Sequence, residues 1–247
     1  MKSFIIKNKF FKSLGVLIFW ITIWQICYIL VNKEIFLVSP FSVFKRIFIL
    51  SFDYNFWLSI VFSLIRVILG FVSAISVGTI LAILMYFSCF LYYIFKPLIL
   101  IIKTTPVASF VILALVFIKS YYLPIFISFL MVMPIVWANV YEGMNRVDKK
   151  LLQMSDIYQF SKMNKIKNIY WPCLKPYFLA AITTGICFAW KSVIAAEVIA
   201  NTSVSIGAQI LNSKVYMETL DVFAWTVVII MLSFVLEKVL IKIVKFI

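Results

Sequence analysis

The sequence predicts an all-α polytopic membrane protein, a single transmembrane domain over residues 1–247 with about six transmembrane helices. Of its 247 residues 65% are hydrophobic and only 13% are charged, whereas soluble domains are about 45–50% apolar and about 25% charged. Too few polar side chains are present to cover a water-soluble globule, so a lipid bilayer is the expected solvent. Soluble enzymes, disordered regions and coiled coils are excluded.

Six apolar runs approach the length of about 20 residues that a helix needs to cross a bilayer. The expected spans are 14–31, 67–87, 98–118, 121–141, 176–200 and 222–241. The first run follows four lysines, as in a signal peptide, but no small-residue cleavage site follows it, so we interpret it as an uncleaved span. The boundaries around 88–106 stay open because lysines and prolines interrupt that apolar stretch.

Two local patterns predict how helices begin and lie. Ser39 and Pro40 are typical of a helix start, with serine as the N-cap and proline at the first helical position. Phe41, Phe44 and Phe48 share one face of the helix that would follow, which suits a short helix on the membrane surface. Asp221 is the expected N-cap of the last span.

A stripe of small residues marks one face of the second span. Its members recur every fourth residue and are Gly70, Ala74, Gly78 and Ala82. Small side chains let two helices approach closely within a membrane, so this face is expected to pack against another span.

The distribution of basic residues predicts the orientation. The net charge is +14, and placing both termini in the cytoplasm puts 16 of the 23 lysines and arginines on the cytoplasmic side and 5 outside. Cytoplasmic loops of membrane proteins carry this excess. The basic charge is thus explained without nucleic acid as a partner.

Catalytic chemistry has little support in the composition. Histidine is absent, and the four cysteines, Cys27, Cys89, Cys173 and Cys187, are scattered among apolar runs without CxxC spacing. We interpret them as small buried hydrophobes. No catalytic residue, metal site or cofactor is predicted.

The only long polar segment lies between the fourth and fifth spans, over residues 142–175, and is expected to face the cytoplasm. Asp148 and Ser161 can each cap a short amphipathic helix, and Trp171-Pro172 would end the second one. Two such helices favour a docking site for a partner protein, with an ordinary basic loop on the membrane as the alternative.

The order of residues in this segment resembles the coupling loop of ABC importer permeases of the nitrate, sulfonate and taurine type. That loop carries a Glu-Ala-Ala signature, then a glycine, then Leu-Pro; this chain has Gln153-Met154-Ser155, Gln159 and Trp171-Pro172 at that spacing, after Val147-Asp148 and Leu151-Leu152. Glycine would suit a left-handed turn between the two helices, and glutamine can adopt it at a cost of about 1 kcal/mol.

The resemblance extends over almost the whole chain. The matching residues are Leu37–Pro40, Leu64–Val67 with Gly70-Phe71, Thr105–Ala108, and Ala189-Trp190 with Ala195–Glu197, followed by Ile206-Gly207. It implies the type I ABC importer permease fold in a bacterial inner membrane. It also implies three partners: a pair of ABC ATPase subunits, a second permease copy and an extracytoplasmic solute-binding protein or lipoprotein. A homodimer is expected and a heterodimer stays open. ATP hydrolysis belongs to the ATPase, since no GxxxxGK[ST] motif occurs here.

The resemblance and the charges together give two groups of candidate site residues. Those expected to couple to the ATPase are Leu151, Leu152, Gln153, Met154, Ser155, Tyr158, Gln159 and Pro172. Those expected near the translocation pathway are Lys191, Glu197 and Trp190 in the fifth span.

Charges inside a span are costly and usually face a bundle interior or a water-filled path. Lys191 either pairs with a carboxylate elsewhere, lines the pathway or snorkels. For Glu197 a structural hydrogen-bonding role is favoured, and Arg66 is expected to snorkel to the membrane interface.

The predicted function is a permease subunit of an ATP-driven importer for a small, anionic organic solute. Two alternatives are an ion-coupled secondary transporter and a polytopic membrane enzyme. The first lacks a visible internal repeat, and the second lacks histidine and clustered carboxylates. The solute itself is not identified by the sequence.

Overall fold

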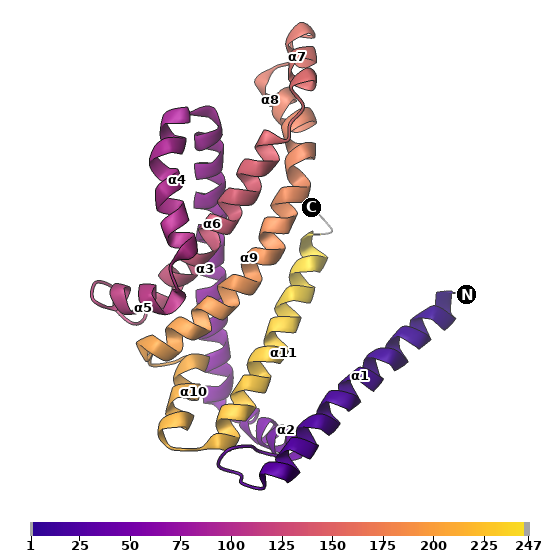
Figure 1. The fold of residues 1–247 in the computed structure, drawn as a ribbon, viewed down its shortest axis with the longest axis vertical. Coiled ribbons are helices and arrows are strands. Elements are labelled where there is room, and N and C mark those ends of the chain that lie inside the picture. Colours follow the sequence, from indigo (N-terminus) through magenta and orange to yellow (C-terminus); the bar gives the residue numbers. More distant parts are fainter. Residues whose placement is uncertain (1, 245–247) are drawn as a thin grey trace. The chain divides into compact units, whose positions relative to one another are not determined.

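The structure is a computed structural model that describes the backbone of residues 2–244 and the side chains of residues 15–240 and 242. Every regular element in this part of the chain is a helix (Figure 1). In chain order they are α1 (Lys2–Val31), α2 (Pro40–Leu50), α3 (Tyr54–Phe87), α4 (Cys89–Thr104), α5 (Val107–Leu115), α6 (Leu123–Asn145), α7 (Lys149–Ile157), α8 (Lys162–Lys165), the π-helix η1 (Ile166–Tyr170), α9 (Trp171–Ala200), α10 (Ile206–Val215) and α11 (Thr219–Val244).

Four described helices are long and apolar enough to cross a membrane. They are Tyr54–Phe87, Leu123–Asn145, the continuous helix Lys162–Ala200 and Thr219–Leu240. These correspond to the expected spans 67–87, 121–141, 176–200 and 222–241. The expected span 14–31 lies in α1, whose described apolar part is the shorter stretch Gly15–Val31.

The expected span 98–118 is not one continuous helix. The chain forms α4 and α5 there, bent by 103° at the break between them. The break falls at Thr105-Pro106, where both residues have extended backbone, because a proline ring disfavours helical geometry in the residue before it. The two helices together are apolar enough to form one bent span.

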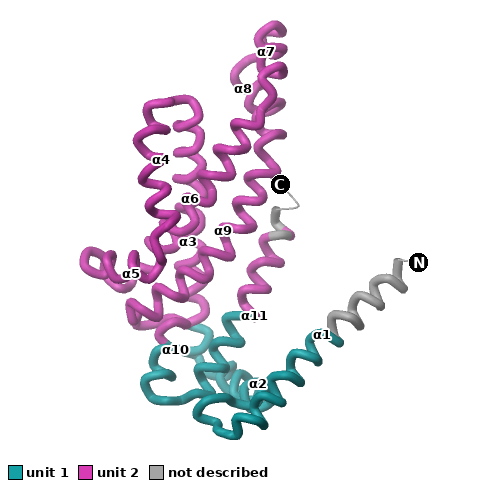
Figure 2. The backbone as a smooth tube through the Cα atoms, in the orientation of Figure 1, with its two compact units in different colours: residues 1–58, 209–230 teal, residues 59–208, 231–247 magenta. Residues whose placement is uncertain are grey.

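The described chain divides into two compact units (Figure 2). One contains residues 1–58 and 209–230, and the other contains residues 59–208 and 231–247. They are called unit 1 and unit 2 below, and each is described by itself.

Unit 1 is built around helix α2, and the predicted start of this helix is confirmed. Ser39 accepts a hydrogen bond from the Ser42 N–H at 3.1 Å, and Pro40 lies at the first helical position. The inward face of α2 packs Val43, which is fully buried, against Val38 and Ala224. This small core fixes the helix across the beginning of α11.

The predicted role of Asp221 as an N-cap is wrong. α11 begins at Thr219, so Asp221 lies inside its first turn. Its two carboxylate oxygens accept hydrogen bonds from Nε and Nη2 of Arg46, at 2.5 and 2.8 Å. The Asp221 carboxylate therefore binds the guanidinium of Arg46 in α2 and does not cap the backbone N–H groups of its own helix.

Unit 2 is organised by close packing of α3 and α9 on α6. The predicted stripe of small residues is confirmed as a packing face: Ala74 and Ala82 are fully buried. A Cβ atom added at Gly70 would lie only 2.5 Å from the Cβ of Ser128 in α6. A larger residue at this crossing would force the two helices apart.

Candidate functional site

The segment between α6 and α9 forms two capped helices, as predicted. The Asp148 carboxylate accepts a hydrogen bond from the Lys150 N–H at 2.8 Å and begins α7. The Ser161 hydroxyl accepts one from the Asn164 N–H at 3.3 Å and begins α8. These short polar side chains satisfy backbone donors that have no partner within the first helical turn.

The turn between α7 and α8 is left-handed at Gln159, whose φ is 51°. After this residue the Phe160 N–H donates to the carbonyl of Ser155 at 2.9 Å and closes the turn. Ser155 is fully buried and donates its hydroxyl to the carbonyl of Leu152 at 2.7 Å. The left-handed turn expected at this position is therefore present with glutamine in place of glycine.

The prediction that Trp171-Pro172 ends the second helix is wrong. The chain continues from α8 through η1 into α9 as one helix, Lys162–Ala200. The Trp171 N–H donates to the carbonyl of Ile166, five residues earlier, and Pro172 has no N–H to place. This wider π-turn directly before the proline lets the helix pass a residue that would otherwise interrupt its hydrogen bonding.

The loop exposes a set of apolar side chains, which we call the apolar loop surface. It consists of Leu151, Met154, Ile157, Tyr158, Met163 and Ile166. Of the other predicted coupling residues, Leu152 is half-buried, while Gln153, Gln159 and Pro172 are exposed. An ion pair between Lys165 and Asp156 ties α8 to α7.

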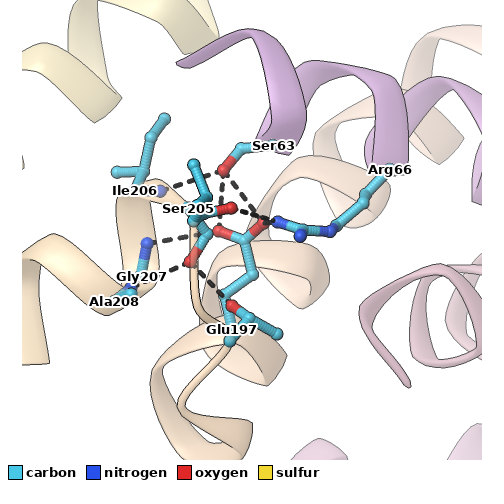
Figure 3. Close-up of polar contacts among 9 residues, drawn as sticks. Ser63, Arg66, Glu197, Ser205, Ile206, Gly207 and Ala208 are labelled. Atoms are coloured by element: carbon cyan, nitrogen blue, oxygen red, sulfur yellow. Dashed lines mark hydrogen bonds and ion pairs between the residues drawn. The ribbon is translucent and has the colours of Figure 1, made fainter. Parts of the chain in front are cut away.

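A second cluster surrounds the carboxylate of Glu197, near the end of α9 (Figure 3). Nη1 of Arg66 donates to Oε1 at 2.9 Å, and the Ser63 hydroxyl lies 2.9 and 2.8 Å from the two oxygens. The Gly207 N–H, at the start of α10, donates to Oε2 at 3.2 Å. Donors from two separate segments thus meet on one carboxylate, which is completely buried.

The same cluster fixes the loop that follows α9. Arg66 also donates to the carbonyl of Val204 at 3.0 Å, and the Ile206 N–H donates to the Ser63 hydroxyl at 3.0 Å. A Cβ atom at position 207 would lie 2.4 Å from the Cβ of Glu197. Glycine is therefore required for the backbone to approach the carboxylate.

Residues 74–244 match the family described as "Binding-protein-dependent transport system inner membrane component". The chain belongs to this family. The match covers α6 to α9 with the apolar loop surface, and Glu197 with Gly207. It establishes a permease component of a transport system with the type I ABC permease fold, not an enzyme.

Individual relatives in this family are named for different anions. "Nitrate import permease protein NrtB" of Synechocystis sp. is 26% identical over 207 residues, covering 80% of this chain and 74% of that protein. "Bicarbonate transport system permease protein CmpB" of Synechococcus elongatus is 27% identical over 153 residues, or 62% and 55%. "Putative aliphatic sulfonates transport permease protein SsuC" of Bacillus subtilis is 26% identical over 93 residues, or 38% and 33%.

The expected snorkelling of Arg66 in this permease is wrong, because its side chain is only 2% exposed and is held by Glu197. The sequence-based prediction assigned a separate role to Arg66 and to Glu197 and did not pair them. One signal was available: Arg66 is the one charged residue of α3, and Glu197 is the one acidic residue of α9. Opposite charges in separate spans of one bundle are expected to find each other.

The three pathway candidates of the permease differ in their surroundings. The Glu197 carboxylate is hydrogen-bonded within the buried cluster. Trp190 is buried, and its Nε1 has no hydrogen-bond partner among the described residues. Lys191 is exposed and forms no ion pair in the part of the chain whose side chains are described. Of these three, only Lys191 presents a charge on an open surface of the unit.

Proposed function

We propose that this chain is the transmembrane permease subunit of an ATP-driven importer for a small anionic solute. A solute-binding protein delivers the cargo outside the membrane, and a separate pair of ABC ATPase subunits docks in the cytoplasm, where both termini lie. A second permease copy completes the pathway. The observation that carries this proposal is the apolar loop surface, which no other part of the described chain covers.

The apolar loop surface has the properties of a docking site. Tyr158 is 71% exposed and Ile157 is 79% exposed, although both belong to the only long polar segment of the chain. Clustered apolar side chains with a charged rim mark surfaces that bind another protein. In a binding-protein-dependent transport component, the cytoplasmic partner that such a surface fits is the ATPase.

The connections of this surface provide a route for movement. The Asp156–Lys165 ion pair holds α7 on α8, and α8 continues without a break into α9. A shift imposed on the loop by ATPase closure is therefore carried directly into a membrane span. Alternating access of the pathway would follow from the displacement of α9 against its neighbours.

An anionic cargo is supported by the charge of Lys191 and by the relatives. Lys191 lies within the apolar part of α9, is exposed and is not neutralised by an ion pair in the described side chains. Nitrate, bicarbonate and aliphatic sulfonates, which name three relatives, are all anions. A lysine in this position supplies a positive potential along a pathway without forming a closed binding site.

The proposal is tested with Tyr158→Asp, and the control is Asn168→Asp, which adds the same charge at an exposed polar position of the loop. Each variant is co-expressed with its ATPase and binding protein, purified and reconstituted in proteoliposomes. We expect Tyr158→Asp to lose both ATPase co-purification and uptake of a labelled anion, and Asn168→Asp to retain both. Wild-type uptake by Tyr158→Asp would reject the docking role of this surface.

A further inference from the structure

Helix α2 is apolar on two sides. Its inward side packs Val43, Ile47 and Leu50 into the core of unit 1. Its outward side exposes Phe41 by 78% and Phe48 by 66%, with Phe44 between them. The inward side is explained by packing within the unit, but the phenylalanine face needs an apolar environment that unit 1 does not supply.

The contacts of α2 fix its depth relative to two apolar helices. Arg46 is bound to Asp221 in the first turn of α11, directly before the apolar residues that begin with Val222. The indole Nε1 of Trp24, in the last part of α1, donates to the carbonyl of Val38 at 3.1 Å. α2 therefore lies at the level where α1 ends and α11 begins, which is the level of the membrane–water interface.

An apolar groove joins this face to the surface of α1. It has a volume of about 440 Å³ and is lined by Ile21, Thr22 and Gln25 of α1 and by Pro40, Phe41 and Phe44 of α2. Exposed side chains of α1, among them Ile18, Phe19 and Trp20, continue the apolar surface away from the groove. A surface that is continuous with a lipid-facing helix is most simply covered by the same lipid.

We propose that α2 is an interfacial membrane helix whose phenylalanine face lies among lipid acyl chains, with one acyl chain in the groove between α1 and α2. Amphipathic helices with aromatic residues bind at this depth. Lys45 is exposed at the border of the phenylalanine face, so its ammonium group can reach the phosphate of a lipid headgroup. The inference needs only membership of an inner-membrane family and is independent of the cargo and of the ATPase.

Site-directed spin labelling tests this placement. Cys27, Cys89, Cys173 and Cys187 are replaced by alanine, and single cysteines are introduced as Phe41→Cys, Phe44→Cys and Phe48→Cys. The control is Glu34→Cys, a charged and exposed position in the loop between α1 and α2. The full-length permease, assembled with its partners in phospholipid nanodiscs, is examined with oxygen, which partitions into lipid, and with a water-soluble nickel chelate.

We expect oxygen to relax the labels at 41, 44 and 48 more than the nickel chelate does, and the reverse at position 34. A lipid spin probe with its label on the acyl chain should also broaden the signal at 41 and 44. Greater accessibility to nickel at all three phenylalanine positions would place the face in water and overturn the proposal. Low accessibility to both reagents, with disulfide formation between copies or with the binding protein, would show a protein interface instead.

Discussion

The guanidinium of Arg66 and the carboxylate of Glu197 form an ion pair at 2.9 Å, although 131 residues separate them in the sequence (Figure 3). The pair is shielded from solvent, and Ser63 and Gly207 complete the coordination of the carboxylate. Removing one partner of a buried ion pair leaves the other charge uncompensated, at a cost of about 3–5 kcal/mol.

Loss of either partner should therefore destabilise the permease more than loss of both. We expect Arg66→Met and Glu197→Leu each to lower the apparent Tm of the detergent-purified protein strongly, and the double variant to recover most of the loss. Fluorescence-detected size-exclusion chromatography after heating ranks the apparent Tm values of the three variants and the wild type. A double variant that is less stable than both single variants would contradict the pair as the source of the effect.

Gln159→Gly should stabilise the turn between α7 and α8. The left-handed conformation costs a residue with a Cβ about 1 kcal/mol, and glycine avoids this cost. A small rise in apparent Tm is expected, while Gln159→Val, which is β-branched, should lower it. Equal stability of the glycine and valine variants would mean that the turn relaxes out of the left-handed region.

Gly70→Ala should disrupt the crossing of α3 and α6. The added methyl group would meet the Cβ of Ser128 at 2.5 Å and the carbonyl oxygen of Ile125 at 2.8 Å, and overpacking of this kind costs about 1–3 kcal/mol. Gly15→Ala is the matched control, because no atom lies within 4 Å of its added Cβ. Membrane yield and apparent Tm should fall for Gly70→Ala alone, and equal losses in both variants would indicate a general effect of replacing glycine.

Lys191→Met should reduce uptake of the anion while the amount of assembled complex and its basal ATPase activity stay unchanged. Lys191→Arg should retain part of the uptake, since the charge remains. Glu237 in α11 lies, like Lys191, within electrostatic range of Cys187, so it is the acid to neutralise in a control. If Lys191→Met lost the complex and Glu237→Gln restored it, the lysine would be a structural partner and not part of the pathway.

The sequence allowed the all-α membrane fold, the caps at Asp148 and Ser161 and the packing stripe to be predicted. Each of these depends on residues close together in the chain: a run of apolar side chains, a short polar side chain before a helix, or small residues at every fourth position. Such local signals determine which residues become helical and which face is buried.

The errors arose where the result depends on a distant partner or on a specific backbone bond. Asp221 could cap its own helix, but Arg46 in another helix takes its carboxylate. Trp171-Pro172 has the composition of a helix end, and only the π-turn bond from Trp171 to Ile166 shows that the helix continues. In the same way, the lysines and prolines left the boundaries around 88–106 open, and the structure has two helices there with a 103° bend between them.

The uninterrupted helix from Lys162 to Ala200 has a mechanical consequence. Its 39 residues, at a rise of about 1.5 Å per residue, give it a contour length of about 58 Å, roughly twice the thickness of the hydrocarbon core. One end carries Met163 and Ile166, two of the six residues of the apolar loop surface, and Glu197 lies three residues before the other end. A tilt of a single degree about one end moves the far end by up to about 1 Å, so the helix acts as a lever. A small rotation of this helix imposed at its cytoplasmic end would thus displace Glu197 relative to Arg66 far enough to lengthen or break their hydrogen bond.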